Sequence, residues 1–416
     1  MLLDRPRIEA YRSALAAVIT PSSVVLDAGA GLGTFSVLAA QLGAARVYAV
    51  DAADVITVAE EIARVNGVAD RIRFIQATAS EVELPEQVDV IVSDLSGALP
   101  LFEEHLPSIV NLRERFLAPG GAMIPRSARL LCAPVSSPSI RASIVEPWRG
   151  VPGVDYGPAE AMALQAPLAR VVKPEDLAGE PRVWGELDYM TLTSPNVTGS
   201  AGWDVEKTVD AIALWFENTM HGEVRSGSGP FSPGSVHSTM VLPLLEPMQP
   251  GRLRLDIEST LAAGRYVTTW HARTEHQPGT RQSTFLSEPR SAGSLVDRTP
   301  ELLGVPRSSS EFLGQRPPRN SEEPRNSEEL TFRAADRVLA RRVAQELLLL
   351  DPTTGVYHVL NETGALVWES LQDGGRIDVI AAEVAARYDV DAARVTDDVA
   401  AIVAELREAK LIEALP

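Results

Sequence analysis

Cysteine is almost missing from this sequence of 416 residues, where it occurs once, at Cys132. A single thiol excludes an internal disulfide framework and a metal site built from several cysteines. The flanking stretch "RLLCAPV" has the apolar character of a buried strand. We therefore interpret Cys132 as a core residue, and we expect no metal.

Long hydrophobic runs are missing as well. No apolar stretch reaches the roughly 18 residues that a membrane-spanning helix needs, and the N-terminus lacks the pattern of a signal peptide. We therefore expect a soluble, cytoplasmic protein without a membrane partner. The length is too great for a single hydrophobic core and favours several domains.

Positive charge is scarce. The sequence contains 38 Lys and Arg residues but 56 Asp and Glu residues, which gives a net charge of −18. Proteins that bind nucleic acids need basic surface to neutralise phosphate, so this balance argues against a nucleic-acid partner. The excess of acid fits a cationic substrate, although solubility alone would also explain it.

Three patterns divide the chain. Short apolar runs alternate with helical patterns over residues 24–126, which indicates a parallel sheet with helical crossovers. Within this part, Leu106–Gly121 is predicted to be a helix followed by a turn. From about Ala128, strand-like pieces separated by turns rich in Gly, Pro and Ser favour a β-sandwich or barrel, interrupted by a helical patch at Gly157–Val172.

The third pattern begins with residues 288–331, which are rich in Pro, Ser, Arg and Glu and contain the tandem "PRNSEEPRNSEE". Two copies of six residues cannot bury a core, so we predict a disordered linker. Three short strands and three helices follow, enough for a small α+β domain of about 85 residues. The predicted parts are thus residues 1–127, 128–287, 288–331 and 332–416.

A glycine-rich loop gives the first chemical signal. In "DAGAGLG", the glycines Gly29, Gly31 and Gly33 follow a predicted strand and open a helix, and Asp51 ends the next strand. Such glycines let the backbone approach a ligand, and the acid can accept both hydroxyls of a ribose. Dinucleotide and S-adenosylmethionine enzymes share this layout. Asp27 favours the methyl donor, because its carboxylate can approach an ammonium group.

Residues 1–287 resemble a protein arginine methyltransferase, a class I S-adenosylmethionine-dependent enzyme. The resemblance is carried by "MLLDRPRIEAYRSAL", "VVLDAGAGLGTFSVLAA", "SEVELPEQVDVIVSD" and "FLAPGGAMIPRSARLLCAPV". It implies an α/β fold with a Rossmann-like domain, a β-barrel, a helical dimerisation arm at about residues 153–172, and a homodimer. The residues expected at the cofactor S-adenosyl-L-methionine are Arg7 at the methionine carboxylate, Asp27, Gly29, Gly31 and Gly33 along the methionine, Asp51 at the ribose, and Ala79 and Ser80 at the adenine.

The stretch "SDLSGALPLFEEHL" is similar to the family's double-glutamate loop, with Asp94 and Glu103 at the two acid positions. Two carboxylates can clamp a planar guanidinium and turn one nitrogen toward the donor. Asp94 is one methylene shorter than glutamate, so a histidine nitrogen, an amine or, least favourably, a carboxylate remain alternatives to arginine. In "FSPGSVHSTM", His237 lies at the family's histidine position, and the resemblance pairs it with Asp4 to take up a proton.

The C-terminal stretch "LLLLDPTTGVYHVLNETGALVWESL" resembles the PqqD-like domain of enzymes that modify ribosomally made peptides, also called a RiPP recognition element. Three short strands leave a sheet edge to which a peptide can add a strand. The residues predicted to bind the leader are Val356, Tyr357, His358, Val359 and Leu360, beside the last helix. A winged-helix domain used for packing or for DNA is the alternative, and the acids of the last helix disfavour DNA.

Together these signals predict an N-methyltransferase acting on a precursor peptide that is held through its leader, with arginine as the favoured acceptor. A methyltransferase acting on a folded protein, such as a ribosomal protein, and a non-catalytic peptide chaperone are the alternatives.

Overall fold

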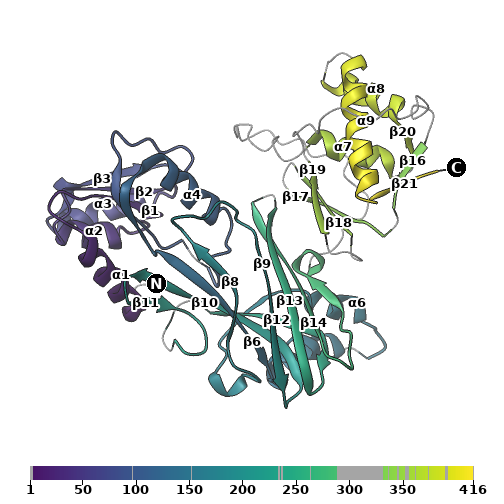
Figure 1. Ribbon diagram of the computed structural model, residues 1–416, viewed down its shortest axis with the longest axis horizontal. Helices are drawn as coiled ribbons and strands as arrows, with labels where there is room; N and C mark the ends of the chain where they lie inside the picture. Colours follow the sequence, from purple (N-terminus) through teal and green to yellow (C-terminus); the bar gives the residue numbers. More distant parts are fainter. Residues whose placement is uncertain are drawn as a thin grey trace. The chain divides into compact units, whose positions relative to one another are not determined.

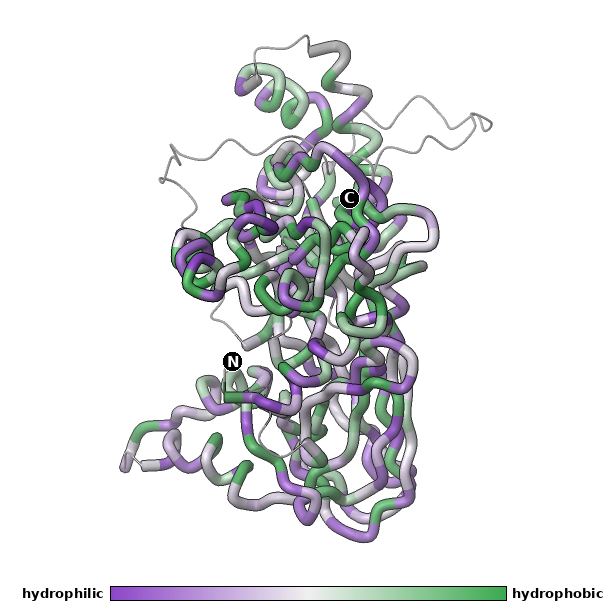
Figure 2. Tube along the Cα trace, turned by 90° about the vertical axis from the view of Figure 1, so that its left-hand side faces the viewer, coloured by the Kyte–Doolittle hydropathy of each residue, from purple (hydrophilic) through white to green (hydrophobic). Residues whose placement is uncertain are grey.

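The computed structural model describes residues 3–95, 97–150, 152–232, 235, 238–262, 264–287, 331–335, 337–343, 346–351, 356–360, 362–372, 374–388 and 392–415. The chain forms two compact units, Met1–Pro289 and Arg290–Pro416, each described here by itself (Figure 1). No helix in the described ranges is long and apolar enough to cross a membrane, and hydrophilic and hydrophobic residues are mixed along the trace (Figure 2).

The first unit begins with a five-stranded sheet whose paired neighbours are all parallel, in the order β3-β2-β1-β4-β5. The chain moves outward from β1 to β3 and then returns to the other side of β1 at β4. Sheets of this kind bind ligands where the strand order reverses, at the carboxyl ends of the strands. The strands are β1 (Val24–Ala28), β2 (Arg46–Asp51), β3 (Ile72–Gln76), β4 (Val88–Ser93) and β5 (Leu117–Ile124).

Helices cover both faces of this sheet. On one face, apolar side chains of α1 (Arg5–Val18), α2 (Thr34–Gln41) and α3 (Ile56–Val65) pack on alternate strand residues. On the other face, α4 (His105–Phe116) packs on the remaining strand residues. Its apolar side chains belong to the same core as those of the antiparallel strands that follow in the chain. The predicted turn after α4 is wrong, because residues from Leu117 continue directly into β5.

The second part of this unit is antiparallel. One sheet has the order β7-β12-β10-β6-β8, with β11 beside β10, and the other has the order β15-β14-β13-β9. Their inner faces meet in one apolar core that contains Cys132, fully buried as predicted. The strands are β6 (Ser127–Val135), β7 (Leu168–Arg170), β8 (Arg182–Asp188), β9 (Val197–Val205), β10 (Val209–His221), β11 (Val224–Gly227), β12 (Thr239–Met248), β13 (Gly251–Ala262), β14 (Arg265–Arg273) and β15 (Arg281–Ser283).

Short helices interrupt the antiparallel part where a helical patch was predicted. They are α5 (Pro138–Val145) and α6 (Gly157–Ala163). The expectation of helix up to Val172 is wrong beyond Ala163, because Leu168–Arg170 forms β7 and pairs with β12. The described residues of this unit also form short 3-10 turns, η1 (Ala69–Arg71), η2 (Glu146–Arg149), η3 (Pro174–Asp176) and η4 (Thr284–Ser287).

The second unit contains the three strands and three helices that were predicted. The strands β17 (Leu339–Val343), β18 (Glu346–Asp351) and β19 (Val356–Leu360) form one antiparallel sheet. The helices are α7 (Glu362–Leu371), α8 (Ile377–Tyr388) and α9 (Ala392–Glu408). A second small sheet, not predicted, is formed by β16 (Thr331–Ala334), β20 (Gly375–Arg376) and β21 (Ile412–Ala414). The fully buried Trp368 is part of the core of this unit.

Candidate active site

The N-terminus of α1 lies at the edge of the parallel sheet and is fixed by its own cap. Asp4 Oδ1 accepts a hydrogen bond from the backbone N–H of Arg7 at 3.1 Å, and a proline occupies the first turn, where its missing N–H costs nothing. Asp4 and Arg7 are 3% and 6% exposed. The cap therefore holds two charged side chains in a buried position beside the end of β4.

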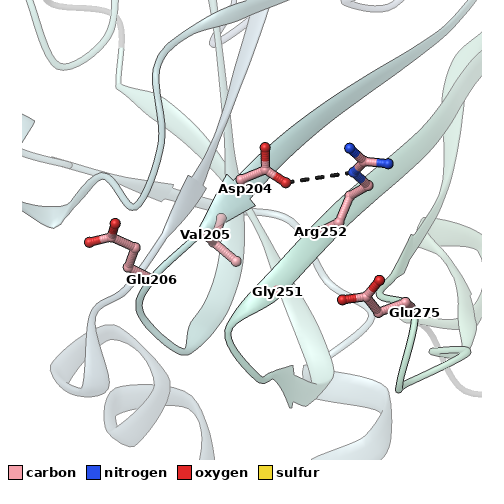
Figure 3. A pocket seen from close by; sticks show the side chains of 6 residues that line it. All are labelled: Asp204, Val205, Glu206, Gly251, Arg252 and Glu275. Atoms are coloured by element: carbon pink, nitrogen blue, oxygen red, sulfur yellow. Dashed lines mark ion pairs between the residues drawn. The ribbon is translucent and has the colours of Figure 1, made fainter.

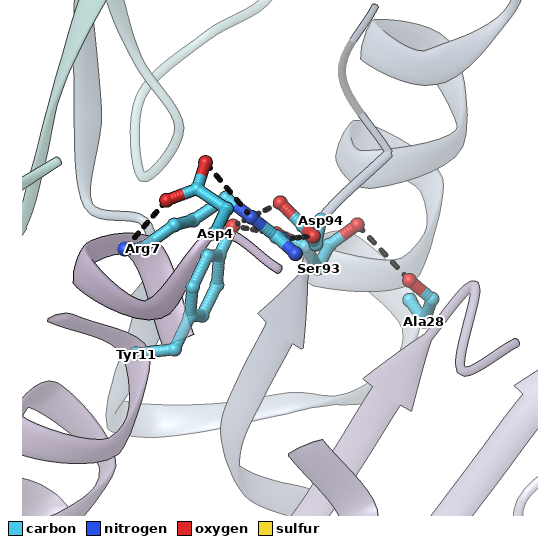
Figure 4. Close-up of polar contacts among 6 residues, drawn as sticks. All are labelled: Asp4, Arg7, Tyr11, Ala28, Ser93 and Asp94. Atoms are coloured by element: carbon cyan, nitrogen blue, oxygen red, sulfur yellow. Dashed lines mark hydrogen bonds and ion pairs between the residues drawn. The ribbon is translucent and has the colours of Figure 1, made fainter. Parts of the chain in front are cut away.

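Arg7 and Asp94 form the centre of a polar cluster (Figure 4). Arg7 Nη1 is ion-paired with Asp94 Oδ2. The Tyr11 hydroxyl, one turn after Arg7, lies 3.0 Å from Asp94 Oδ1 and 2.9 Å from the carbonyl oxygen of Ser93. Burial raises the pKa of Tyr11 above its ordinary value, so the hydroxyl keeps its proton for these acceptors. Both carboxylate oxygens of Asp94 thus have a partner on α1.

The glycine-rich loop follows β1 and stays attached to β2. The backbone N–H groups of Gly29 and Ala30 donate to the carbonyl oxygen of Val50 at 2.8 and 2.9 Å. Gly29 has a φ of +76° and packs so closely on Leu95 that an added Cβ would lie 2.4 Å from Leu95 Cδ2. Only glycine fits there, because the left-handed conformation and the contact both exclude a side chain.

Asp27, at the end of β1, has an unusual environment. It is 1% exposed, and its Oδ2 accepts a hydrogen bond from the Ser36 hydroxyl at 2.6 Å. Its Oδ1 is buried and has no hydrogen-bond partner among the described residues. Burial raises the pKa of Asp27 to about 6. A buried, unsatisfied carboxylate oxygen is costly, and a ligand ammonium would satisfy it.

Asp51, at the end of β2, binds the backbone of the glycine-rich loop. Its Oδ2 accepts from the backbone N–H of Gly31 and its Oδ1 from that of Ala53, both at 2.8 Å. The loop after β3, which carries Ala79 and Ser80, leaves the sheet at the same edge. Apart from Arg7, which lies on α1 beside the end of β4, the predicted cofactor residues therefore gather along the carboxyl ends of β1, β2 and β3, and the orphaned oxygen of Asp27 and the glycine cradle fit S-adenosylmethionine.

Glu103 lies in the connection between β4 and α4. Its side chain is exposed, and no hydrogen bond or ion pair involves it within the described part of the chain. Its φ is +42°, although it is not a glycine. Left-handed backbone at a non-glycine residue is strained and occurs often at functional sites. The structure thus gives Glu103 a constrained backbone, whereas Asp94 is held by Arg7 and Tyr11.

His105 was not predicted from the sequence. It begins α4, is 8% exposed, and has no hydrogen-bond partner at Nδ1 in the ranges that the structure describes. Burial lowers its pKa to about 4, so the ring is neutral at physiological pH. In the sequence, only the position of His105 directly after the two acids of "FEEHLPSI" could have pointed to it as a candidate site residue.

Of the other predicted residues, His237 is outside the described residues, so its pairing with Asp4 stays a prediction. Val356–Leu360 forms β19, the last strand of its sheet, and β19 pairs with β18 alone among the described strands. In β19 the side chain of His358 is half-buried and that of Leu360 is buried.

The antiparallel part carries a surface hollow of about 520 Å³. It is lined by the ends of β9 and β13, and an ion pair between Asp204 and Arg252 spans 3.6 Å across it (Figure 3). None of the predicted site residues lines this hollow. The polar cluster at the parallel sheet, not this hollow, is the candidate active site.

Known proteins match the chain in two places. Protein arginine N-methyltransferase 1 of Schizosaccharomyces pombe is 31% identical over 242 residues, which cover 56% of this chain and 71% of that protein. The chain belongs to the protein arginine N-methyltransferase family. The probable protein arginine N-methyltransferase 6 of Arabidopsis thaliana is 32% identical over 256 residues, and the match spans only 59% of that relative's length.

Solved structures agree with this membership. A Trypanosoma brucei PRMT1 enzyme–prozyme heterotetrameric complex with AdoHcy matches with a TM-score of 0.64 and 26% identity, covering 68% of this chain and 95% of that one. Arabidopsis thaliana protein arginine methyltransferase 10 matches in fold, with a TM-score of 0.58 and 22% identity, covering 68% and 95%. The Rossmann-like and barrel-like architecture predicted for this family member is thereby confirmed.

Two family models also match. The model of Coenzyme PQQ synthesis protein D (PqqD) matches residues 346–412, which confirms the predicted likeness of the second unit. The model of Ribosomal protein L11 methyltransferase (PrmA) matches residues 12–124, the parallel-sheet part.

Proposed function

We propose that the chain is an S-adenosylmethionine-dependent N-methyltransferase whose substrate is a ribosomally made precursor peptide, with arginine as the favoured acceptor. The observation that carries this proposal is the placing of the buried Arg7–Asp94 pair and of the unsatisfied Asp27 Oδ1 at the carboxyl ends of the neighbouring strands β4 and β1, where the strand order reverses. It brings a site for a zwitterionic cofactor next to a carboxylate that a cationic acceptor can approach.

The cofactor would be held by charges at both ends of its amino-acid part. Asp27 Oδ1 would accept from the ammonium group, Arg7 would hold the carboxylate, and Asp51 would accept the ribose hydroxyls. S-adenosylmethionine supplies a methyl group on a positively charged sulfur. Arg7 is already paired with Asp94, but a guanidinium carries five N–H donors in a plane and can serve two carboxylates together.

The acceptor would be oriented by Asp94 and Glu103. A guanidinium is always protonated, so carboxylates on its N–H groups fix its plane and concentrate electron density on the remaining nitrogen. Because Tyr11 and Arg7 hold Asp94 in place, we propose that Asp94 sets the position of the acceptor and that the exposed Glu103 completes the clamp when the peptide binds. Asp4 and His237 would take up the proton that the nitrogen releases.

The precursor peptide would bind in the second unit, as an extra strand along β19. An edge strand has a row of unpaired backbone groups, and a leader can satisfy them without any catalytic residue. The match to the PqqD family supports this part of the proposal. Covalent attachment of both units in one chain would raise the local concentration of the core peptide at the methyltransferase site.

We also propose a homodimer. The region predicted as the dimerisation arm exposes Val154, Tyr156 and Val171, and the outer face of α3 exposes Val58 and Val65. Exposed apolar side chains become part of protein interfaces where they form a contiguous patch. Docking of the arm of one subunit on α3 of the other would bury both sets.

A second function is favoured by the match of residues 12–124 to the ribosomal protein L11 methyltransferase family. Under this alternative the acceptor lies on a folded protein, and the second unit serves another purpose. A leader peptide added in excess would then leave methylation unaffected.

The test uses the full chain, labelled S-adenosylmethionine, and peptides encoded by the short reading frames beside the gene. We expect the mass of one peptide to rise by one methyl group in place of hydrogen, and we expect the isolated leader to inhibit this reaction competitively. Methylation of ribosomal proteins with no effect of any leader would favour the second function. Absence of cofactor binding would revive the non-catalytic chaperone.

A further inference from the structure

The loop between β3 and β4 is held by a side chain that is distant in sequence. Arg115, in the last turn of α4, places its guanidinium against this loop. Nη1 donates to the carbonyl oxygens of Ala79 at 3.2 Å and Ser80 at 3.4 Å, and Nη2 donates to that of Val82 at 2.6 Å. One side chain therefore binds three carbonyl oxygens of the loop that the family resemblance assigns to the adenine.

We propose that Arg115 is a positioning residue for the purine end of the cofactor site. This inference rests on the proposed function, since it concerns the same cofactor. Arg115 acts through the loop: by fixing three of its carbonyl oxygens, it fixes the path of Ala79 and Ser80, and with it the surface that these residues present to the purine.

The shape of a guanidinium explains why arginine stands here. Its planar fork directs donors along fixed lines, so it can serve several acceptors spread along a backbone, whereas a lysine ammonium is a point charge on a flexible stem. Arg115 Nη1 also donates to Asn111 Oδ1 at 3.1 Å, one turn earlier on α4, and this bond helps to hold the guanidinium in place. Its ion pair with Glu83 spans 2.9 Å, but Glu83 is 84% exposed, and exposed pairs contribute little. The backbone contacts therefore carry the effect.

The loop itself is a preformed turn. Thr78 Oγ1 donates to Glu81 Oε2 at 2.8 Å, and the N–H of Val82 donates to the carbonyl oxygen of Thr78 at 3.0 Å. These bonds shape the turn but do not attach it to the rest of the domain. The side chains of Val82, which is buried, and of Ala79, which is partly buried, attach the loop through the apolar core, and the guanidinium of Arg115 attaches its backbone carbonyl oxygens.

The same helix provides a matched control. Arg113 also donates to backbone carbonyl oxygens, those of Tyr189 at 3.0 Å and Leu192 at 2.9 Å. Those contacts join α4 to the antiparallel part, away from the loop that follows β3. Arg113→Gln and Arg115→Gln thus remove the same group from the same helix, and only the second releases the adenine loop.

The experiment measures binding of S-adenosylhomocysteine and of S-inosylhomocysteine, which has oxygen in place of the purine 6-amino group, by calorimetry on the full chain. For Arg115→Gln we expect about tenfold weaker binding of S-adenosylhomocysteine, or about 1.4 kcal/mol, and a smaller preference for adenine over the analogue. Arg115→Lys should recover part of both effects. Arg113→Gln should keep the preference of the wild type. In the ligand-free protein, hydrogen exchange of the amides of residues 77–83 should be faster in Arg115→Gln alone.

The outcomes separate the inference from the proposed function. If the wild type binds S-adenosylhomocysteine and Arg115→Gln binds it equally well, the inference is overturned while the proposed function stands. Equal weakening for both ligands, or the same result from Arg113→Gln, also overturns it, because a general loss of structure would then explain the data. If the wild type binds neither ligand, the proposed function fails and the inference fails with it.

Discussion

Replacing Asp27 by asparagine should make the ligand-free protein more stable and abolish its response to the cofactor. Moving a carboxyl pKa from 3.8 to about 6 costs the ionised form about 3 kcal/mol at neutral pH. Asparagine removes this charge and can still accept the hydrogen bond of Ser36. Its amide N–H groups add a cost of about 1–2 kcal/mol if they stay unpaired. We therefore expect Asp27→Asn to raise the free energy of unfolding by about 1–2 kcal/mol at pH 7.

The pH dependence of this effect has a definite sign. The folded state keeps the proton of Asp27 up to about pH 6, whereas the unfolded chain releases it near 3.8. Lowering the pH from 7 toward 4 therefore favours the folded wild type, because the folded state binds more protons in this window. The advantage of Asp27→Asn should be largest above pH 6 and fade below it.

Urea unfolding followed by tryptophan fluorescence suits this test, because five of the six tryptophans lie before residue 288 and only Trp368 lies in the second unit. Asp89→Asn is the control, since the exposed Asp89 accepts a hydrogen bond from the backbone N–H of Val24 at 2.8 Å; its midpoint should stay equal or fall. S-adenosylhomocysteine at a hundred times its Kd should stabilise the wild type by about 2.7 kcal/mol and leave Asp27→Asn unchanged. A less stable Asp27→Asn with the pH profile of the wild type would refute the reasoning.

Three further predictions concern single residues. Tyr11→Phe keeps the stacking on Phe35, with ring centroids 4.2 Å apart, but removes the hydroxyl that holds Asp94. We expect kcat/KM for the acceptor to fall about tenfold, with a stability loss of only about 1 kcal/mol in urea, and unchanged kinetics would contradict this role. Gly33→Ala should lower the free energy of unfolding, measured in urea, by about 1–2 kcal/mol. The reason is that Gly33 has a φ of +72° and an added Cβ would lie 3.0 Å from the Cβ of Ala59. An unchanged free energy of unfolding would show that the loop can rearrange. Val65→Glu should shift sedimentation from dimer to monomer, and an unshifted dimer would exclude α3 from the interface.

The parallel sheet and its cofactor residues could be predicted because their signals are local. Asp27 and Gly29 lie within one short stretch, and Asp51 ends the next apolar run, so chain order alone places them at one edge of the sheet. The strand β5 was missed for a local reason too. The stretch "APGG" within β5 has the composition of a turn.

Contacts between residues far apart in sequence could not be predicted. The hydroxyl of Tyr11 meets the carbonyl oxygen of Ser93 across 82 positions, and Arg115 meets the carbonyl oxygen of Val82 across 33. Such pairs depend on how helices pack on a sheet, which the hydrophobic pattern constrains only to a face. The sequence indicated that Asp94 lies at the end of β4, but its attachment to Arg7 required the structure.

The most direct test of the proposed function is mass analysis of a leader-bearing, arginine-containing peptide from a flanking reading frame after incubation with the full chain and S-adenosylmethionine. We predict methylation on a nitrogen of the core part, and competition by the isolated leader. Asp94→Asn should abolish the methyl gain while leader binding persists. A methylated peptide from Asp94→Asn at the wild-type rate, or methylation indifferent to the leader, would contradict the account.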